Sequence, residues 1–239
     1  MSQVRAALFD LDDTLIDHQH ASRAAMVGVR DRFAAFQRIT LDELGVEHQR
    51  ILDLLHHDVA LGQRTVDDAR IERYRLLFAY AGADGNHASA AAELHRRVYQ
   101  ASRCRVAGAL ELLQALRGRV RIAVVTNNTV AEQTEKLATF DLATLVDALV
   151  TSEEIGAAKP DGRIFAAALE RVDCAPGDAV MIGDSWTHDV LGATTAGISA
   201  IWLNRNGAAH PDPDVAPQIA TLLPTVEVAA MIAPIEGWQ

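Results

Sequence analysis

The second half of the chain alternates between short apolar runs and segments with helical patterning, and this alternation constrains the fold more than any other feature. The apolar runs, which predict buried strands, lie at residues 121–126, 145–151, 179–182 and 198–203. The segments with helical spacing of apolar residues lie at 109–116, 130–140, 163–172 and 190–196. Such alternation predicts an α/β fold in which a Rossmann-like parallel sheet carries helices on both faces.

A further strand is predicted at residues 6–10, but a long helical segment separates it from the others. No strand pattern interrupts residues 17–103, and no proline occurs before Pro160. The helices expected in this segment lie at 21–36, at 41–57, from 65 onward and at 88–103. We therefore predict one core domain, residues 1–16 and 104–239, into which an all-α domain, residues 17–103, is inserted.

The end of the chain has a different composition. Five of the seven prolines lie beyond residue 210. Because proline interrupts both helices and ladders, this end is expected to hold a loop and a short helix at 226–232. We expect no chemistry from residue 204 onward.

Composition and charge exclude some classes of partner. Apolar residues make up 49% of the 239 residues, which supports a substantial core, and the net charge of −10 disfavours binding to nucleic acid. Cys104 and Cys174 have neither a metal-binding nor a disulfide spacing, which fits a reducing compartment. No apolar run reaches the length of a membrane span. We expect a cytoplasmic protein without nucleic-acid or membrane partners.

Two acids, Asp10 and Asp12, follow the first predicted strand directly. Because side chains alternate along a strand with a period of two, an extended backbone would point both carboxylates to the same side. Two carboxylates aimed at one spot repel each other unless a cation or a shared proton lies between them. Repulsion between the two carboxylates would destabilise a purely structural arrangement, and we therefore interpret the pair as part of a reactive site.

Polar residues also follow the later strands. Thr126 and Asn127 end the second strand, Lys159 follows the third, and Asp184 ends the fourth, with Asp189 five residues later. Ligands of open parallel sheets bind beyond the carboxyl ends of the strands. These side chains are therefore expected to gather around Asp10 and Asp12.

Taken in order, these residues resemble the four motifs of the haloacid dehalogenase-like (HAD) superfamily. The matching segments are Asp10-x-Asp12-x-Thr14, Thr126, Lys159-Pro160 and Gly183-Asp184-Ser185-x-x-x-Asp189. The helical insertion after the first motif is similar to the α-helical cap of one large branch. The resemblance implies a Rossmann-like core with a cap domain.

The resemblance also implies a division of labour between the two acids. The residue matching Asp10 attacks phosphorus and forms an aspartyl-phosphate, which water then hydrolyses. The residue matching Asp12 protonates the leaving oxygen and later takes a proton from that water, and crowding by other carboxylates would favour its protonated form. Phosphatases of the superfamily carry an acid at the Asp12 position, whereas haloacid dehalogenases do not. Asp12 therefore favours phosphate-ester hydrolysis over carbon–halogen cleavage.

The remaining motif residues are implied to hold a cation and the phosphate. Oxygen ligands from Asp10, the backbone carbonyl of Asp12 and Asp184 suit Mg²⁺ as cofactor. Thr126 and the amide of Asn127 would hold phosphoryl oxygens, with Lys159 offsetting negative charge. Asp189 would support either the metal or Lys159, although a purely structural role is equally compatible with the sequence.

These features lead to one hypothesis and several alternatives. The hypothesis is a Mg²⁺-dependent phosphatase for a small phosphorylated metabolite, present as a monomer or homodimer. The alternatives are a phosphomutase of the same superfamily, a 2-haloacid dehalogenase, and a non-catalytic binding protein. Specificity is expected to lie in the inserted helices, where the polar candidates are His18, His20, His56, His57 and Arg64.

Neighbours of the motif residues receive structural interpretations. Asp13 is expected in a turn or facing solvent, Ser185 as a cap of its loop, and Trp186 either in the core or at the mouth of the pocket. Glu153 and Glu154 are expected either near Lys159 or simply exposed.

Overall fold

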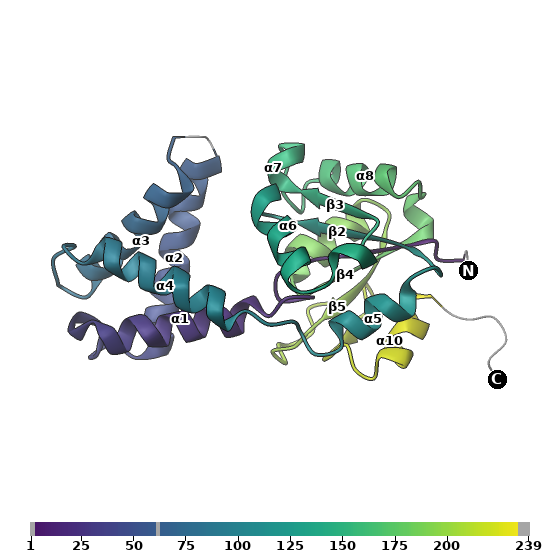
Figure 1. Cartoon of the computed structure of the whole chain (residues 1–239). Helices are drawn as coiled ribbons and strands as arrows, with labels where there is room; N and C mark the ends of the chain where they lie inside the picture. Colours follow the sequence, from purple (N-terminus) through teal and green to yellow (C-terminus); the bar gives the residue numbers. More distant parts are fainter. Residues whose placement is uncertain (1–2, 61–62, 234–239) are drawn as a thin grey trace. The chain divides into compact units, whose positions relative to one another are not determined.

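The computed structural model describes residues 3–60 and 63–233, and the chain divides into two compact units (Figure 1). One unit combines the chain up to Asp17 with the chain from Cys104 onward, and the other is His18–Arg103. We call them the core unit and the helical unit. Among the described helices, none is both long and apolar enough to cross a membrane.

A six-stranded parallel sheet forms the centre of the core unit, which confirms the predicted fold class. Its strands run in the order β3-β2-β1-β4-β5-β6. Their bounds are β1 Ala6–Phe9, β2 Arg121–Thr126, β3 Ala148–Thr151, β4 Ala179–Gly183, β5 Ser199–Leu203 and β6 Gln218–Ile219.

Alternating residues of the strands enter two separate apolar layers. In β1, Ala7 and Phe9 pack on one face, and Ala6 and Leu8 pack on the other. Helices α5 (Ala109–Leu116) and α10 (Thr225–Ile232) lie side by side on the first face (Figure 1). Helices α8 (Gly162–Arg171) and α9 (Gly192–Thr195) cover the second. Both faces of β1 are therefore buried, as its continuous apolar run predicted.

The chain direction around the sheet reverses beside β1. After β1 the chain builds β2 and β3 on one side, then crosses to build β4, β5 and β6 on the other. The crossing places the carboxyl ends of β1 and β4 next to each other, which is the position where ligands bind in open α/β sheets.

Several elements differ from the sequence prediction. The run at 145–151 begins as a 3₁₀ turn, η2 (Ala143–Leu145), and pairs with β2 only from Ala148. The helix predicted at 190–196 is a π-helical turn, η4 (Trp186–Leu191), followed by α9. The short strand β6 was missed because its two residues follow a proline-rich loop and carry no apolar alternation.

Three further elements belong to the described part of the core unit. They are α6 (Val130–Thr139), α7 (Ser152–Ile155) and η3 (Pro176–Asp178).

The helical unit has an apolar core of its own. Its helices are α1 (His18–Arg32), α2 (Leu41–Ala60), α3 (Val66–Tyr80) and α4 (Ala88–Ser102), with a 3₁₀ turn, η1 (Ala34–Phe36). Phe33, Phe36 and Phe78 pack edge-on or tilted against one another inside it. Thr65 caps α3 by accepting a hydrogen bond from the Asp68 amide, which confirms the predicted helix start. The helix predicted at 21–36 instead ends at Arg32.

Two histidines of the helical unit stack inside a polar cluster. The rings of His48 and His95 are parallel at 5.1 Å, and His95 Nδ1 lies 2.5 Å from the Tyr74 hydroxyl. Burial, with Arg73 nearby, holds the pKa of His48 well below its usual range and lowers the pKa of His95 to about 3. Both imidazoles are therefore neutral in the folded protein at neutral pH.

This burial predicts that the helical unit loses stability in mild acid. Below about pH 6.5 the unfolded chain takes up protons on His48 and His95 while the folded chain does not, so the free energy of unfolding falls as pH falls, by at most about 1.4 kcal/mol per pH unit for each histidine. Urea unfolding followed by circular dichroism between pH 7 and pH 5 measures this. Either imidazole titrating near pH 6.5 in NMR spectra of the folded protein would contradict the prediction.

Candidate active site

Asp10 directly follows β1 and lies almost completely buried. Its backbone amide donates to the carbonyl of Ile182 at 2.9 Å, which extends the β1–β4 pairing by one residue. Its side chain therefore emerges at the carboxyl edge of the sheet beside the point of reversal. Burial, followed by the nearby carboxylates of Asp189 and Asp184, raises the pKa of Asp10 well above its ordinary value, even though Lys159 lowers it.

Lys159 joins Asp10 to Asp189. Its Nζ donates to Asp10 Oδ1 at 2.5 Å and to Asp189 Oδ1 at 2.6 Å, and all three side chains are at least nine-tenths buried. Burial alone would lower the pKa of Lys159, but the carboxylates of Asp10 and Asp189 raise it above its ordinary value. Lys159 therefore carries its positive charge inside the protein.

Asn127 holds the backbone at Lys159. Its Oδ1 accepts from the Lys159 amide at 2.7 Å, and its Nδ2 donates to the Lys159 carbonyl at 3.0 Å. The side chain thus links the end of β2 to the loop before α8. This contact is additional to the phosphate contact that was expected of the Asn127 backbone amide.

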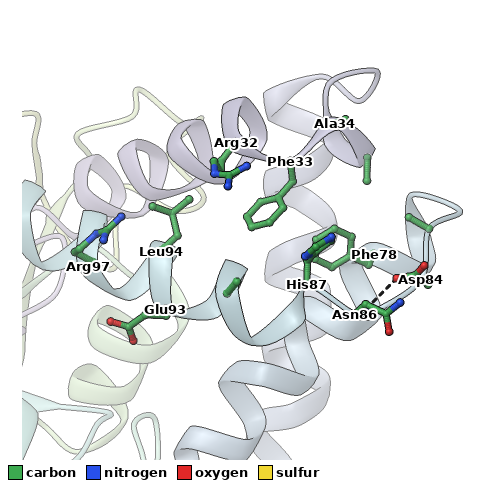
Figure 2. Close-up of a pocket in the computed structure, with 13 residues that line it drawn as sticks. Arg32, Phe33, Ala34, Phe78, Asp84, Asn86, His87, Glu93, Leu94 and Arg97 are labelled. Atoms are coloured by element: carbon green, nitrogen blue, oxygen red, sulfur yellow. Dashed lines mark hydrogen bonds between the residues drawn. The ribbon is translucent and has the colours of Figure 1, made fainter.

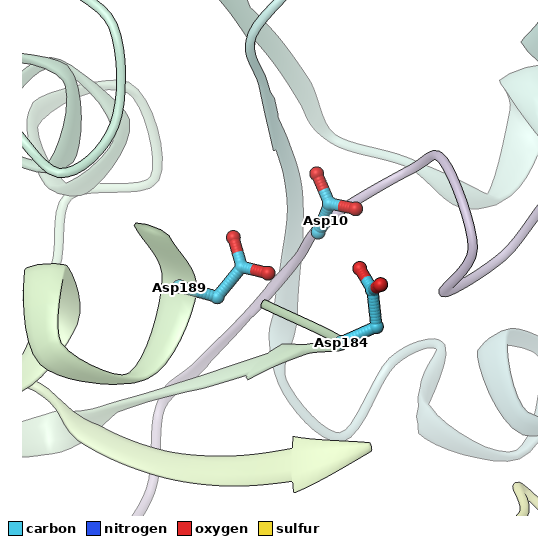
Figure 3. A group of neighbouring side chains, drawn as sticks. All are labelled: Asp10, Asp184 and Asp189. Carbon is cyan, nitrogen blue, oxygen red and sulfur yellow. The ribbon is translucent and has the colours of Figure 1, made fainter. Parts of the chain in front are cut away.

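Three carboxylates from separate elements converge around Asp10 (Figure 3). Asp10 follows β1, Asp184 follows β4 and Asp189 belongs to η4, and carboxylate oxygens of the three lie within 4.8 Å of one another. Burial, together with the charges of Asp189 and Asp13, raises the pKa of Asp184 to about 7. With all three carboxylates ionised, the cluster would hold more negative charge than Lys159 can balance.

This arrangement fits a divalent cation. The raised pKa values of Asp10 and Asp184 indicate that the positive charge beside these carboxylates does not offset their burial, and a bound cation would add it. Oxygen atoms are the ligands that Mg²⁺ prefers. Asp10 and Asp184 both belong to the predicted metal set. Asp189 already forms an ion pair with Lys159, and this contact holds the ammonium group of that lysine in place.

Asp12 has a different environment from Asp10. Lys136 of α6 donates to both of its carboxylate oxygens, at 2.8 and 2.9 Å, and Gln133 Nε2 donates to Oδ2 at 3.1 Å. The described partners of Asp12 are thus a cation and an amide, and the expectation that other carboxylates crowd Asp12 stays a prediction. The chain turns directly after Asp12, at Asp13, and the described partners of Asp10 and Asp12 are different lysines.

Thr126 ends β2 and is buried. Its Oγ1 accepts a hydrogen bond from Gln133 Nε2 at 3.2 Å. Gln133 therefore contacts both Thr126 and Asp12. The structure thus brings together the end of β2 and the loop after β1 through one side chain of α6.

The structural interpretations of neighbouring residues had mixed outcomes. Asp13 adopts a left-handed turn conformation, with φ of 65°, as a turn residue would, but it is buried and does not face solvent. Ser185 caps η4 by accepting from the His188 amide, as predicted. Glu153 accepts from the Val130 amide and Glu154 pairs with Arg171, so these contacts do not involve Lys159.

Trp186 packs into an aromatic group rather than standing alone. Its ring makes edge-on contacts with Trp202 and His210, both at centroid distances of about 5 Å. This contact supports the core-packing interpretation of Trp186.

The helical unit contains a hollow of its own, of about 740 Å³ (Figure 2). Phe33, Phe78 and Leu94 give it an apolar wall, and Arg32 and Arg97 bring positive charge. Among the described side chains, those of His18, His20 and Arg64 are not part of its lining.

Those five candidates have different outcomes. His18 Nδ1 lies 2.8 Å from the Tyr99 hydroxyl, within the helical unit. The side chains of His56 and His57 lie outside the described residues. For His20 and Arg64, a role in specificity stays a prediction.

Sequence reasoning missed Gln133, Lys136 and Arg205. Arg205 follows β5 and ties down the loop after β1, donating to the carbonyl of Asp13 and to the carboxylate of Asp17. A signal for Lys136 was present, since the chain has twenty arginines but only two lysines. Those two lysines are the ones that bind Asp10 and Asp12.

Comparison with known proteins identifies the family. Residues 4–197 match the family model described as a haloacid dehalogenase-like hydrolase. Because this match covers most of the chain, the protein belongs to the haloacid dehalogenase-like hydrolase family, and the predicted membership is confirmed.

Individual relatives include enzymes with different substrates. A ribulose-1,5-bisphosphate 5-phosphatase from Halopiger xanaduensis is 31% identical, over 82% of this chain and 83% of its own. Relatives of 44% and 40% identity align over only 37% and 47% of their own length.

Solved structures extend the comparison. The HAD-hydrolase YfnB of Bacillus subtilis, bound to magnesium, is 26% identical with a TM-score of 0.72, over 95% of this chain and 99% of its own. A 2-haloacid dehalogenase from Pseudomonas syringae is 27% identical with a TM-score of 0.63, over 96% of this chain and 100% of its own.

Gly183, the last residue of β4, is predicted to be essential for the geometry of Asp189. A Cβ at Gly183 would lie 2.3 Å from Asp189 Cγ, so Gly183→Ala must displace the carboxylate from Lys159 and from the Ser185 amide. We expect a loss of about 1–3 kcal/mol in the free energy of unfolding, measured by urea titration of tryptophan fluorescence.

Gly177 offers a matched control because a Cβ there meets no atom within 4 Å. Gly177→Ala is expected to change the free energy of unfolding by less than about 0.5 kcal/mol. Equal stability of the two variants would contradict the close approach of Asp189 to Gly183.

Proposed function

We propose that this hydrolase is a phosphatase that cleaves a small phosphate monoester through an aspartyl-phosphate on Asp10. The carrying observation is the buried site at the carboxyl edge of the sheet, where Asp10 lies among acids and beside Lys159. A phosphoryl group that binds at this edge would meet the carboxylate of Asp10, because Asp10 directly follows the carboxyl end of β1.

Each residue of the site has a role in this proposal. An oxygen of Asp10 attacks phosphorus while the bond to the leaving oxygen breaks, and Asp12 gives that oxygen a proton. Asp12 then takes a proton from the water that attacks the phosphoenzyme, which releases inorganic phosphate and restores Asp10. Thr126 and the backbone amide of Asn127 hold phosphoryl oxygens, and Lys159 offsets the negative charge of Asp10 and phosphate.

We further propose Mg²⁺ as the cofactor, held by Asp10, Asp184 and the backbone carbonyl of Asp12, with Asp189 supporting the site through Lys159. When bound, the cation would neutralise repulsion between the phosphate and the acids. The proximity of three buried or partly buried carboxylates, which could all ionise only beside added positive charge, supports this assignment.

The helical unit is proposed as a cap domain, inserted at residues 17–103 of a core formed by residues 1–16 and 104–239. Its separate apolar core supports an independent unit that can change its surface without disturbing the sheet. We propose that it selects the substrate and that the protein acts on a small metabolite in the cytoplasm as a monomer or homodimer.

Two rival reactions give different products. A 2-haloacid dehalogenase is the rival that a solved relative favours, and its signature is chloride released from a 2-haloacid. A phosphomutase would convert one sugar phosphate into an isomer without net release of phosphate. Asp12 supports the phosphatase over the dehalogenase, because an acid two residues after the nucleophile serves leaving oxygens, which need a proton, and not leaving halides.

Removal of the nucleophile tests the reaction. Asp10→Asn is expected to lower kcat by at least about a thousandfold in a screen of phosphorylated metabolites for phosphate release, because the amide cannot form the phosphoenzyme. Asp53→Asn, at an exposed position of α2, serves as the control and is expected to keep full activity. Wild-type turnover in Asp10→Asn, with its fold verified by circular dichroism, would rule out the nucleophile.

Removal of the metal tests the cofactor by activity and by stability. EDTA is expected to abolish phosphate release and millimolar Mg²⁺ to restore it. Mg²⁺ at a hundred times its Kd is expected to stabilise the wild type by about 2.7 kcal/mol, seen as a higher Tm, but not Asp184→Asn. Full activity in EDTA, together with a Tm that does not change on addition of Mg²⁺, would refute the cofactor assignment.

A further inference from the structure

Lys136 occupies a position where a lysine is rarely found. It lies on α6, its side chain is 1% exposed, and its charge is therefore almost completely removed from water. The chain uses arginine at twenty of its twenty-two basic positions, and its other lysine, Lys159, contacts the proposed nucleophile. A buried lysine in such a chain needs a specific reason.

The contacts of Lys136 give that reason. Its ammonium group lies 2.8 and 2.9 Å from the two carboxylate oxygens of Asp12 and 3.1 Å from Glu132 Oε1. The Glu132 pair lies within one helix, whereas the Asp12 pair joins α6 to the loop after β1. Contact with both oxygens fixes the direction of the Asp12 carboxylate as well as its place.

Gln133 extends this contact to the proposed phosphate clamp. It is fully buried one turn before Lys136, and its Nε2 donates to both Asp12 Oδ2 and Thr126 Oγ1. Since Thr126 Oγ1 accepts this bond, the hydroxyl proton of Thr126 is left to point elsewhere, as donation to a phosphoryl oxygen requires. Gln133 Oε1 is buried and has no hydrogen-bond partner among the described residues.

We propose that Lys136 and Gln133 are positioning residues for phosphoryl transfer: Lys136 aims the carboxyl group of Asp12, and Gln133 couples Asp12 to Thr126. The proposal rests on the proposed function, because it assigns the residues that organise its proton donor and its phosphate clamp. Proton donation requires the acid within hydrogen-bond reach of the leaving oxygen, so a misdirected Asp12 would penalise leaving groups that need a proton.

The dependence on the leaving group provides the test. Phenyl phosphate and 4-nitrophenyl phosphate have similar shapes, but phenoxide is the more basic leaving group and depends more on a proton. Lys136→Met keeps the length of the side chain and removes its charge. We expect kcat to fall by about 10–100-fold on phenyl phosphate and by less than about fivefold on 4-nitrophenyl phosphate, with KM changed by less than about threefold.

Two further variants separate positioning from folding. Lys136→Arg keeps the cation and is expected to restore most of the loss, since a guanidinium group can also contact both carboxylate oxygens. Glu132→Gln removes a second carboxylate partner of Lys136 and leaves Asp12 in place, and it is expected to keep the wild-type ratio of the two rates. A purely structural lysine would lower both rates equally in Lys136→Met.

A double-mutant cycle tests whether Lys136 acts through Asp12. In an Asp12→Asn background, Lys136→Met is expected to lower kcat on phenyl phosphate by less than about twofold, against about 10–100-fold in the wild-type background, because there is no longer a proton donor to aim. Gln133→Leu is expected to raise KM as well as lower kcat, because Thr126 loses its partner.

The outcomes distinguish the inference from the proposed function. If the wild type hydrolyses both esters and Asp12→Asn selectively slows phenyl phosphate, but Lys136→Met slows neither or both equally, the inference is overturned and the phosphatase stands. If Lys136→Met and Asp12→Asn have additive effects, the inference is also overturned. If the wild type hydrolyses neither ester nor any metabolite of the screen, the proposed function itself is wrong, and with it the inference.

Discussion

The structure of the site depends on one buried interaction, the ammonium group of Lys159 between the carboxylates of Asp10 and Asp189. Charges removed from water must be paired, because an isolated buried charge costs several kcal/mol or more. This requirement ties together three segments that are far apart in the sequence: the end of β1, the loop before α8, and η4. Asn127 and Gly183 serve the same arrangement, one by holding the backbone at Lys159 and the other by leaving room for Asp189.

The two acids of the first motif are distinguished by what surrounds them. Asp10 is buried among carboxylates that raise its pKa, beside a lysine shared with Asp189. Asp12 is less buried and faces a lysine and an amide from α6. Groups of the same type can therefore perform different tasks a few residues apart, because partner and burial set their charge and orientation.

Much of the fold could be predicted because the determining signals are local. Strand segments such as 121–126 and 179–182 consist mostly of consecutive apolar residues. The start of a helix such as α3 is marked by its capping residue, Thr65. Errors occurred where tertiary contacts override local pattern. The run at 145–151 begins as a 3₁₀ turn, and the segment after Asp184 winds into a π-helix that buries Asp189.

The sequence by itself determined the order of the motif residues, their placement after strands, and the family to which the chain belongs. Strand periodicity and the ends of apolar runs suffice for the placement, because both are properties of neighbouring residues, whereas the family followed from the resemblance of the ordered motifs. Only the tertiary structure decided which cation faces which acid. Lys136 and Asp12 are 124 residues apart in the chain, so the helical pattern of α6 says nothing of their contact. The packing of α6 against the sheet brings them together. The buried ammonium group of Lys136 is stable there because the carboxylate of Asp12 lies beside it.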